Sequence, residues 1–462
     1  MARPQTSRRD ERRDLTRRAL IQWSVAAGAA LGVSRSKIFD ILERSAGKGV
    51  AFAASEHATT RSVHLAAGNG GLSWFQLFWP QVDVARARNP SFAWHQVGME
   101  QDVPGTAQPL VVGPDTPWTS LAAQRQVTCF TCGSNETHTS NGTSTTTLNG
   151  SGIFAIATAL QASSPCVIPV VTIGDAALGN APGGATPSNV GKAEGIVDLF
   201  NSAASRMGGL LENKADADLF KAHYDAFIQL NRAANRPTTK SAYTTASGAA
   251  QFLGTNLAGK LAITDADRAR YGITPGTRAN VAAIGNAFII TVKAFKMGLT
   301  NCVVLPAMRD DPHDAFDSND VATVPPQLKT VFDAFMADLI KTIDDNTRIS
   351  LADDTVITIH GDTPKDARDR NGWPDGTAQN TNHVYVYSAG HLKSGWFGSL
   401  ARDGAVQGFG ADGKPATYSG ANTAKFATAS IAYAIAKRDE RAISSFANGV
   451  TIGGVFGNLK DA

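Results

Sequence analysis

The sequence predicts an α/β protein with a mainly parallel sheet and helices on both of its faces. Short apolar runs typical of buried strands, at 165–173, 301–306 and 354–360, alternate with amphipathic helical patterns at 280–296 and 327–345. Strands that alternate with helices form parallel sheets, because each connecting helix packs on a sheet face. The chain has 462 residues, 43% of them hydrophobic, so it can bury a large core.

The first half of the chain opens with a strand. Residues 61–67 alternate in polarity and end in Gly68-Asn69-Gly70-Gly71, which predicts a strand and a tight turn. The segment 133–152 is rich in polar, turn-forming residues and predicts a surface loop, with a helix beginning at Ile153. After the strand at 165–173, residues 192–235 show a helical pattern. We expect 175–280 to be a mostly helical insertion.

The second half carries the clearest patterns. The helix at 280–296 is stopped by Gly298 and leads into the strand at 301–306. The helix at 327–345 places its apolar residues on one face and leads into the strand at 354–360. A strand at 384–388 and a helix at 423–437 complete the expected elements.

The N-terminal segment differs from the rest of the chain. Seven arginines and three acids fall in the first 20 residues, and the apolar stretch Trp23–Val33 is too short to span a bilayer. A basic region, a short apolar region and Ala51-Phe52-Ala53 have the layout of an export signal. Arg17-Arg18 before apolar residues is typical of the twin-arginine route. The alternative is a basic arm with an N-terminal helix.

We therefore expect residues 1–53 to be a twin-arginine-type export signal and linker, and 54–462 to form a single α/β domain. The expected location is the periplasm or the medium. No transmembrane segment is expected. Only 18% of residues are charged and the net charge is +3, so nothing calls for nucleic acid as a partner.

The four cysteines include a CxxC pair, Cys129 and Cys132. No second CxxC or histidine pair follows, so a zinc site is incomplete. A local disulfide or a pair of buried thiols is the favoured interpretation over metal binding or redox catalysis.

Polar residues with metal-ligand chemistry follow several expected strands. Histidine and carboxylate two positions apart, as in Asp311-Pro312-His313, suit a divalent ion. Sites in parallel sheets gather at the carboxyl ends of strands. The candidates are His138, Asp311, His313, His360, Asp362, Asn382, His383 and His391.

The order of these motifs resembles a widespread bacterial family that is exported by the twin-arginine route and related in fold to alkaline phosphatases and sulfatases. The resemblance runs from about residue 61 to 400. It rests on Gly70-Gly71-Leu72-Ser73 after the first strand, and on Asp311-Pro312-His313, Gly361-Asp362-Thr363-Pro364, Thr381-Asn382-His383 and the turn Ala389–Gly395. It implies an alkaline-phosphatase-like domain at 54–462.

The departures from the family pattern fall on its acids. Gln76, Trp79, Ile359 and Asn382 stand where that family has carboxylates. A two-metal site places two divalent ions, with about four positive charges in total, within roughly 4 Å of each other. Such a site needs carboxylates to neutralise that charge. The resemblance therefore implies an eroded site that holds one divalent ion at most, Zn²⁺ or Ca²⁺, with Asp311, His313, Asn382 and His383 as its ligands.

Two functions follow from these observations. The first is a non-catalytic protein that binds an envelope glycan, lipid or protein. The aromatic residues Trp74, Phe75, Phe78 and Trp79 either offer a surface for such a partner or pack beneath the long loops. The second is a metal-dependent hydrolase of phosphate or sulfate esters with one ion. In the second, Thr139 attacks, and His138 or His391 donates a proton to the leaving group. The missing acids favour the first.

Overall fold

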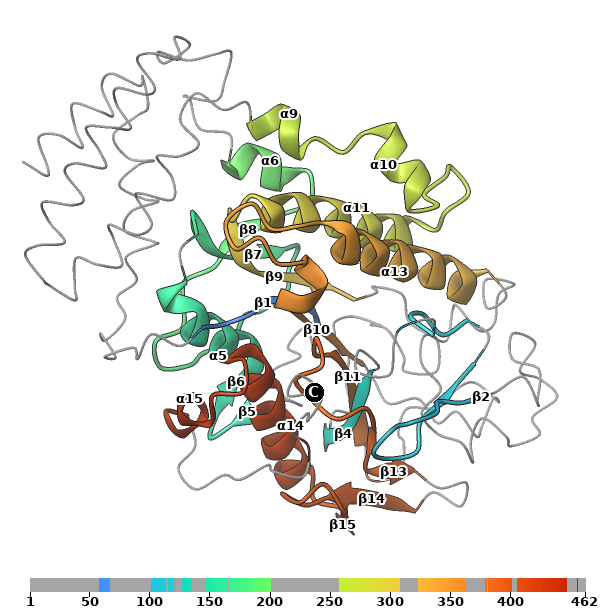
Figure 1. The fold of residues 1–462 in the computed structure, drawn as a ribbon, viewed down its shortest axis with the longest axis vertical. Coiled ribbons are helices and arrows are strands. Elements are labelled where there is room, and N and C mark those ends of the chain that lie inside the picture. The colour runs from blue at the N-terminus through green and yellow to red at the C-terminus, as the bar shows by residue number, and fades with distance from the viewer. Residues whose placement is uncertain are drawn as a thin grey trace, which may run out of the picture.

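The computed structural model describes residues 58–66, 101–113, 115–119, 121, 127–134, 147–164, 166–200, 257–307, 323–361, 379, 381–400, 405–446 and 455. They form a central sheet between two layers of helices (Figure 1). The predicted α/β class, with a mainly parallel sheet, is therefore confirmed. Among the described helices, none combines the length and the apolar character that crossing a bilayer requires.

Eight strands make up the central sheet, in the order β12-β4-β11-β10-β1-β9-β7-β8. β11 is antiparallel to its neighbours β10 and β4, and the other paired strands run parallel. The bounds of the strands are β1 (Arg61–Ala66), β4 (Thr128–Ser134), β7 (Ile168–Ile173), β8 (Ser188–Val190), β9 (Thr300–Pro306), β10 (Thr355–His360), β11 (Thr381–Tyr387) and β12 (Gly395–Phe397).

One face of the sheet packs against α11 (Ala279–Lys296) and α13 (Val324–Lys341). The two helices contact each other through Phe288 and Phe335, whose ring centroids lie 3.9 Å apart. Val63 and Leu65 of β1 join the same apolar cluster. α6 (Gly195–Phe200), α9 (Leu257–Leu261) and α10 (Asp265–Arg270) lie beyond this layer (Figure 1).

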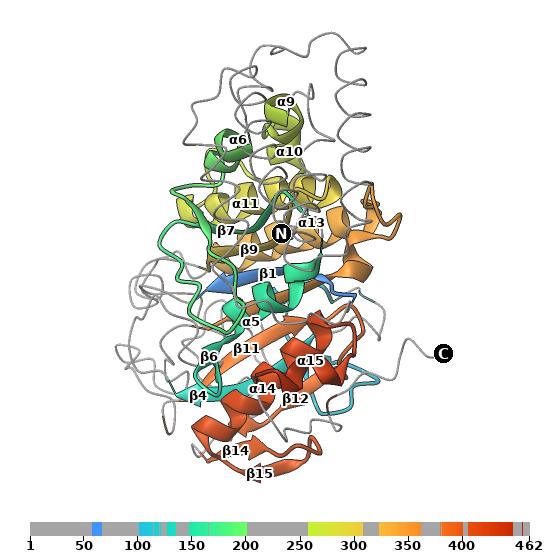
Figure 2. The same cartoon turned by 90° about the vertical axis from the view of Figure 1, so that its left-hand side faces the viewer.

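The other face packs against α5 (Ile153–Leu160) and α14 (Gly420–Ile435), which face the viewer in Figure 2 together with α15 (Glu440–Ser444). Two 3₁₀ turns, η3 (Gln161–Ser163) and η5 (Leu351–Asp354), precede strands β7 and β10. Short pairs lie outside the central sheet: β2 (Gln101–Asp102) with β3 (Val111–Val112), β5 (Thr147–Leu148) with β6 (Ser151–Gly152), and β13 (Ser399–Leu400) with β14 (Val406–Phe409) and β15 (Pro415–Thr417).

Two expected boundaries differ from the observed ones for a local reason. α13 ends at Lys341 and not at residue 345, because Thr342 is already extended (ψ 121°) and begins a hairpin. β11 begins at Thr381, earlier than expected, because polar residues at its start are buried by its neighbours. Of the helical pattern at 192–235 and the insertion at 175–280, residues 201–256 lie outside the described residues.

The CxxC pair lies within β4. Cys129 belongs to the apolar cluster under α11 and α13, and Cys132 to the cluster under α5 and α14. The two side chains thus lie on opposite faces of the sheet. All four cysteines are buried and free, as the buried-thiol alternative predicts.

Buried charges connect β1 to the segments that precede β10. The Arg61 guanidinium pairs with Asp344 and with Asp354, the latter at 3.2 Å, and all three side chains are buried. Lys437 Nζ also lies 2.5 Å from Asp354. Because a buried carboxylate is costly without a partner, this cluster fixes the position of β1 against the entry to β10.

Arg61→Ala is expected to lower the free energy of unfolding by about 3–5 kcal/mol, because Asp344 would lose its buried cation. Arg268→Ala is the matched control, since Arg268 pairs with the fully exposed Asp265 at 3.5 Å. Its loss should stay below about 1 kcal/mol. Urea unfolding of the purified chains measures both, and equal losses would contradict the assignment.

Candidate functional site

The sequence predicts a site at one edge of the central sheet, which we call the carboxyl edge. β1, β4, β9 and β10 end there, and the antiparallel strand β11 begins there. Ala66 lies beside Pro306, His360 beside Val384, and Ser134 beside Thr381. In parallel sheets, sites form at this edge.

The described residues contain three of the seven predicted site residues. Asn382 and His383 lie at the carboxyl edge, at the start of β11. Asp311 and His313 follow the end of β9, and His138 and Thr139 follow the end of β4, but these four lie outside the described residues. The same holds for Asp362 and for the aromatic residues at 74–79.

His391 is not brought to this edge. It follows the turn after β11, in which Ala389 and Gly390 have φ of 53° and 79°, and it is buried. Since β11 runs away from the carboxyl edge, its last residue, Tyr387, pairs with Ile357 near the start of β10. His391 therefore lies toward the opposite edge from His383. The structure therefore does not support the predicted role of His391 as a proton donor beside Asn382 and His383.

The Asn382 side chain joins the ends of β10 and β11. Its Nδ2 donates to the Gly361 carbonyl oxygen (2.9 Å), and its Oδ1 accepts the backbone N–H of His383 (2.7 Å). A Cβ atom at residue 361 would lie 2.6 Å from Oδ1, so the contact needs glycine there. The amide that was predicted as a metal ligand thus serves as a clamp between two strand ends.

His383 is buried against the neighbouring strands. Its ring lies 5.5 Å from the Trp396 ring, and Trp396 Nε1 donates to Thr131 Oγ1 (3.0 Å) on the strand paired with β11. Burial lowers the pKa of His383 to about 3, so the imidazole is neutral at pH 7.

Asn382 and His383 point to opposite faces of the sheet, because side chains alternate along a strand. Val384, which shares the face of Asn382, packs in the cluster under α5 and α14. Tyr385, which shares the face of His383, packs in the cluster under α11 and α13. The structure therefore does not bring these two predicted ligands together around one ion.

A buried polar chain crosses β1 and β10 on the α5 face. His64 Nδ1 lies 2.7 Å from Thr358 Oγ1, which lies 2.9 Å from His360 Nε2. The rings of His64 and His360 lie 4.9 Å and 4.8 Å from the Phe154 ring. A threonine hydroxyl has one proton and two acceptor lone pairs, so at most one of the two imidazoles can accept from it, and the other must donate to it.

The two histidines of this hydrogen-bonded chain, His64 and His360, are neutral at pH 7. Burial lowers the pKa of His360 to about 3. Burial, and then the nearby His360, place the pKa of His64 well below its usual value. The sequence patterns did not single out His64 or Thr358 as candidate site residues, although the alternation of 61–67 places His64 on the same face as Ser62.

Over the described part of the chain, no group of three or more His, Cys, Asp and Glu side chains has a metal-binding arrangement. What the described edge offers is a set of buried polar side chains, His360, Asn382 and His383, hydrogen-bonded or packed within the protein. Comparison of the chain with protein-family models, with curated proteins and with solved structures finds no match.

Asn382→Asp separates the clamp from a metal ligand. A carboxylate cannot donate to the Gly361 carbonyl oxygen, so the free energy of unfolding should fall by about 1–3 kcal/mol. Asn189→Asp is the matched control, because Asn189 Nδ2 also donates to a glycine carbonyl, that of Gly174 (2.7 Å), but at an exposed position. If residue 382 were a metal ligand, the added negative charge of the aspartate would instead raise the affinity of the chain for Zn²⁺ or Ca²⁺, which titration calorimetry measures.

The pH dependence of stability should report His360. Its pKa is about 3 in the folded chain and about 6.5 when unfolded. Between these values the unfolded state binds more protons, so stability falls as pH falls, by up to about 1.4 kcal/mol per pH unit. Urea unfolding from pH 7 to pH 5 should show a shallower slope for His360→Gln than for the wild type. Parallel slopes would contradict this assignment.

Proposed function

We propose that the chain is an exported protein that acts by binding a component of the cell envelope, on an alkaline-phosphatase-like scaffold whose metal site has eroded. The observation that carries the proposal is the clamp made by Asn382. In the resembling family this position is an acid, whereas here an amide bonds two backbone groups at the edge where the ion would lie.

The histidines at the same edge support the proposal. His360 turns back along β10 to Thr358, and His383 packs against Trp396 on the opposite sheet face. Both residues are about 1% exposed. Side chains held in this way stabilise strand ends and leave little imidazole surface for a ligand sphere. The proposed partners are an envelope glycan, lipid or protein, and the proposed location is periplasmic or secreted by the twin-arginine route.

One observation favours the alternative, a hydrolase of phosphate or sulfate esters with one divalent ion. The segments that contain His138, Thr139, Asp311 and His313 leave from the ends of β4 and β9, at the same edge as His383. β4 is the direct neighbour of β11, and neighbouring strands lie about 4.8 Å apart. A single Zn²⁺ or Ca²⁺ held there would polarise an ester oxygen.

Metal content and turnover distinguish the two functions. The full chain purified from the periplasm should contain zinc and calcium well below one ion per chain, and should not hydrolyse aryl phosphates or aryl sulfates. Mass spectrometric elemental analysis and a chromogenic ester assay measure this.

The control pair is His383→Ala and His391→Ala, two buried histidines toward opposite edges of the sheet. A full equivalent of metal and measurable turnover, both lost in His383→Ala and kept in His391→Ala, would establish the hydrolase and overturn the binding proposal.

A further inference from the structure

The exposed large apolar side chains in the described part of the chain fall in one short stretch. Ile340, Ile343 and Ile349 are 42%, 41% and 42% exposed. Ile340 lies in the last turn of α13, and the other two flank the turn that follows it. Single exposed apolar residues are ordinary, but a group on one turn marks an interaction surface.

The backbone brings these three residues to one end of α13, with Ile343 and Ile349 on opposite faces of a hairpin, because Ile343 lies opposite Ser350 and Ile349 lies opposite Asp344. Ile343 forms an isolated bridge with Ser350, and the backbone N–H of Asp344 donates to Ile349 O (2.9 Å). Ser350 Oγ in turn donates to the carbonyl oxygen of Ile340 (2.9 Å). The segment 343–350 is thus a hairpin folded against the end of α13.

The hairpin is anchored in the core. Asp344 Oδ1 accepts the backbone N–H groups of Asn346 and Thr347 at 2.6 and 2.8 Å, and its carboxylate pairs with the buried Arg61. A turn that is already fixed loses little conformational entropy when its apolar side chains become buried against a partner.

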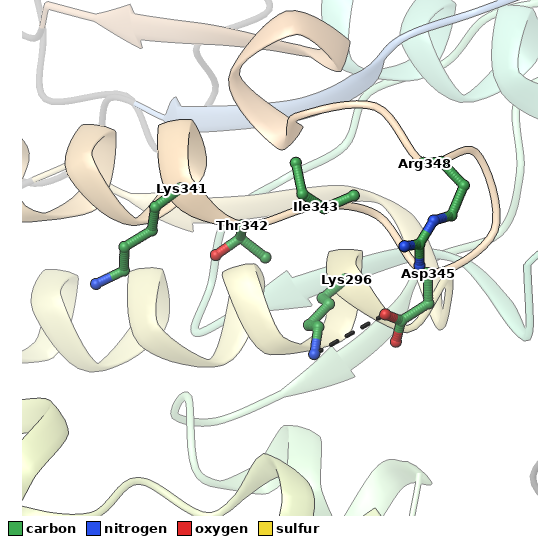
Figure 3. A pocket seen from close by; sticks show the side chains of 6 residues that line it. All are labelled: Lys296, Lys341, Thr342, Ile343, Asp345 and Arg348. Atoms are coloured by element: carbon green, nitrogen blue, oxygen red, sulfur yellow. Dashed lines mark ion pairs between the residues drawn. The ribbon is translucent and has the colours of Figure 1, made fainter.

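Basic side chains surround the hairpin. A surface depression of about 560 Å³ is lined by Lys296, Lys341, Thr342, Ile343, Asp345 and Arg348 (Figure 3). A second depression, of about 180 Å³, shares Lys296 and Lys341 and adds Arg270 and Lys293. Together they contain five basic residues and two carboxylates, Asp338 and Asp345.

Part of this charge has a local explanation. Lys296 and Lys341 lie in the last turns of α11 and α13, whose C-termini each have about half a negative charge. Lys341 also pairs with Asp338 (2.8 Å), and Lys296 with Asp345 (3.9 Å). Arg348, outside both helices, adds a further positive charge. The helix ends do not account for the isoleucines.

We propose that this surface, which comprises Ile340, Ile343, Ile349, Lys296, Lys341 and Arg348, docks on a bilayer that contains anionic phospholipid. Apolar side chains on a fixed turn enter the acyl boundary while neighbouring lysine and arginine side chains meet the phosphates, which is the arrangement of interfacial membrane binding. A soluble anion would leave the isoleucines in water. A second copy would bring like charges face to face across a two-fold axis.

The surface lies away from the carboxyl edge. Asp345 N–H donates to Lys296 O (3.0 Å), and the hairpin leads into η5 and the start of β10. It therefore lies toward the amino ends of β9 and β10. A chain docked there would direct its carboxyl edge away from the lipid. The inference rests on the proposed function in taking lipid as the envelope partner, but metal content and ester turnover test the carboxyl edge separately from vesicle binding.

Vesicle sedimentation tests the proposal on the full chain, with phosphatidylcholine vesicles prepared with and without phosphatidylglycerol. Ile343→Ser with Ile349→Ser should weaken binding to the anionic vesicles about tenfold, from lost apolar burial. Lys341→Gln with Arg348→Gln should weaken it about 25-fold, at about fivefold per charge, and added salt should reproduce that loss. Lys414→Gln, at another exposed lysine, should bind like the wild type.

The comparison among full-length variants cancels any contribution of the basic N-terminal segment, which all of them share. Far-ultraviolet circular dichroism checks that each variant is folded. Equal binding by all variants, or no preference for phosphatidylglycerol, would overturn the proposal. So would saturable binding of inorganic phosphate without vesicle binding, or an isoleucine-dependent dimer in sedimentation equilibrium.

Discussion

The alternation of side chains across the eight-stranded sheet is the constraint on which the rest of the structure depends. Adjacent residues of a strand point to opposite faces, and here both faces are covered by helices. The buried apolar residues of the strands therefore fall into two clusters, one on each face. Polar side chains within the sheet must find partners on their own face, because a buried polar group without a partner is costly.

That constraint explains how the polar residues are used. Thr358 and His360 share a face of β10 and reach His64 on β1, so three polar groups form one buried chain. Asn382 and His383 are adjacent in sequence and so are divided between the two faces. A pair that looks like a ligand set along the chain becomes, in the sheet, a clamp on one side and a packed ring on the other.

Much of the fold follows from the sequence, and the reasons are local. The strands β1, β9 and β10 and the helices α11 and α13 have strong periodic patterns, and the observed elements match them closely. The early end of α13 could not be predicted, because Leu339 to Ile343 continue the helical pattern while Ser350 and Arg61 fix the hairpin from distant positions.

The arrangement of the candidate site was harder to predict from the sequence than the fold. Sequence spacing shows that residues follow strands, but it does not show which sheet face or which end of the sheet they occupy. Likewise the position of His391 depends on the direction of β11, which an isolated strand pattern does not encode.

The four buried thiols have a practical consequence. Burial raises the pKa of Cys166 and Cys302 to about 12, and it also raises the pKa of Cys129 and Cys132. Thiolates, which react with alkylating reagents, are thus scarce in the folded chain. Cys129 and Cys132 point to opposite faces of the sheet, so they cannot form a disulfide with each other. Alkylation should proceed only as strands separate, which makes these cysteines built-in probes of how rarely the sheet opens.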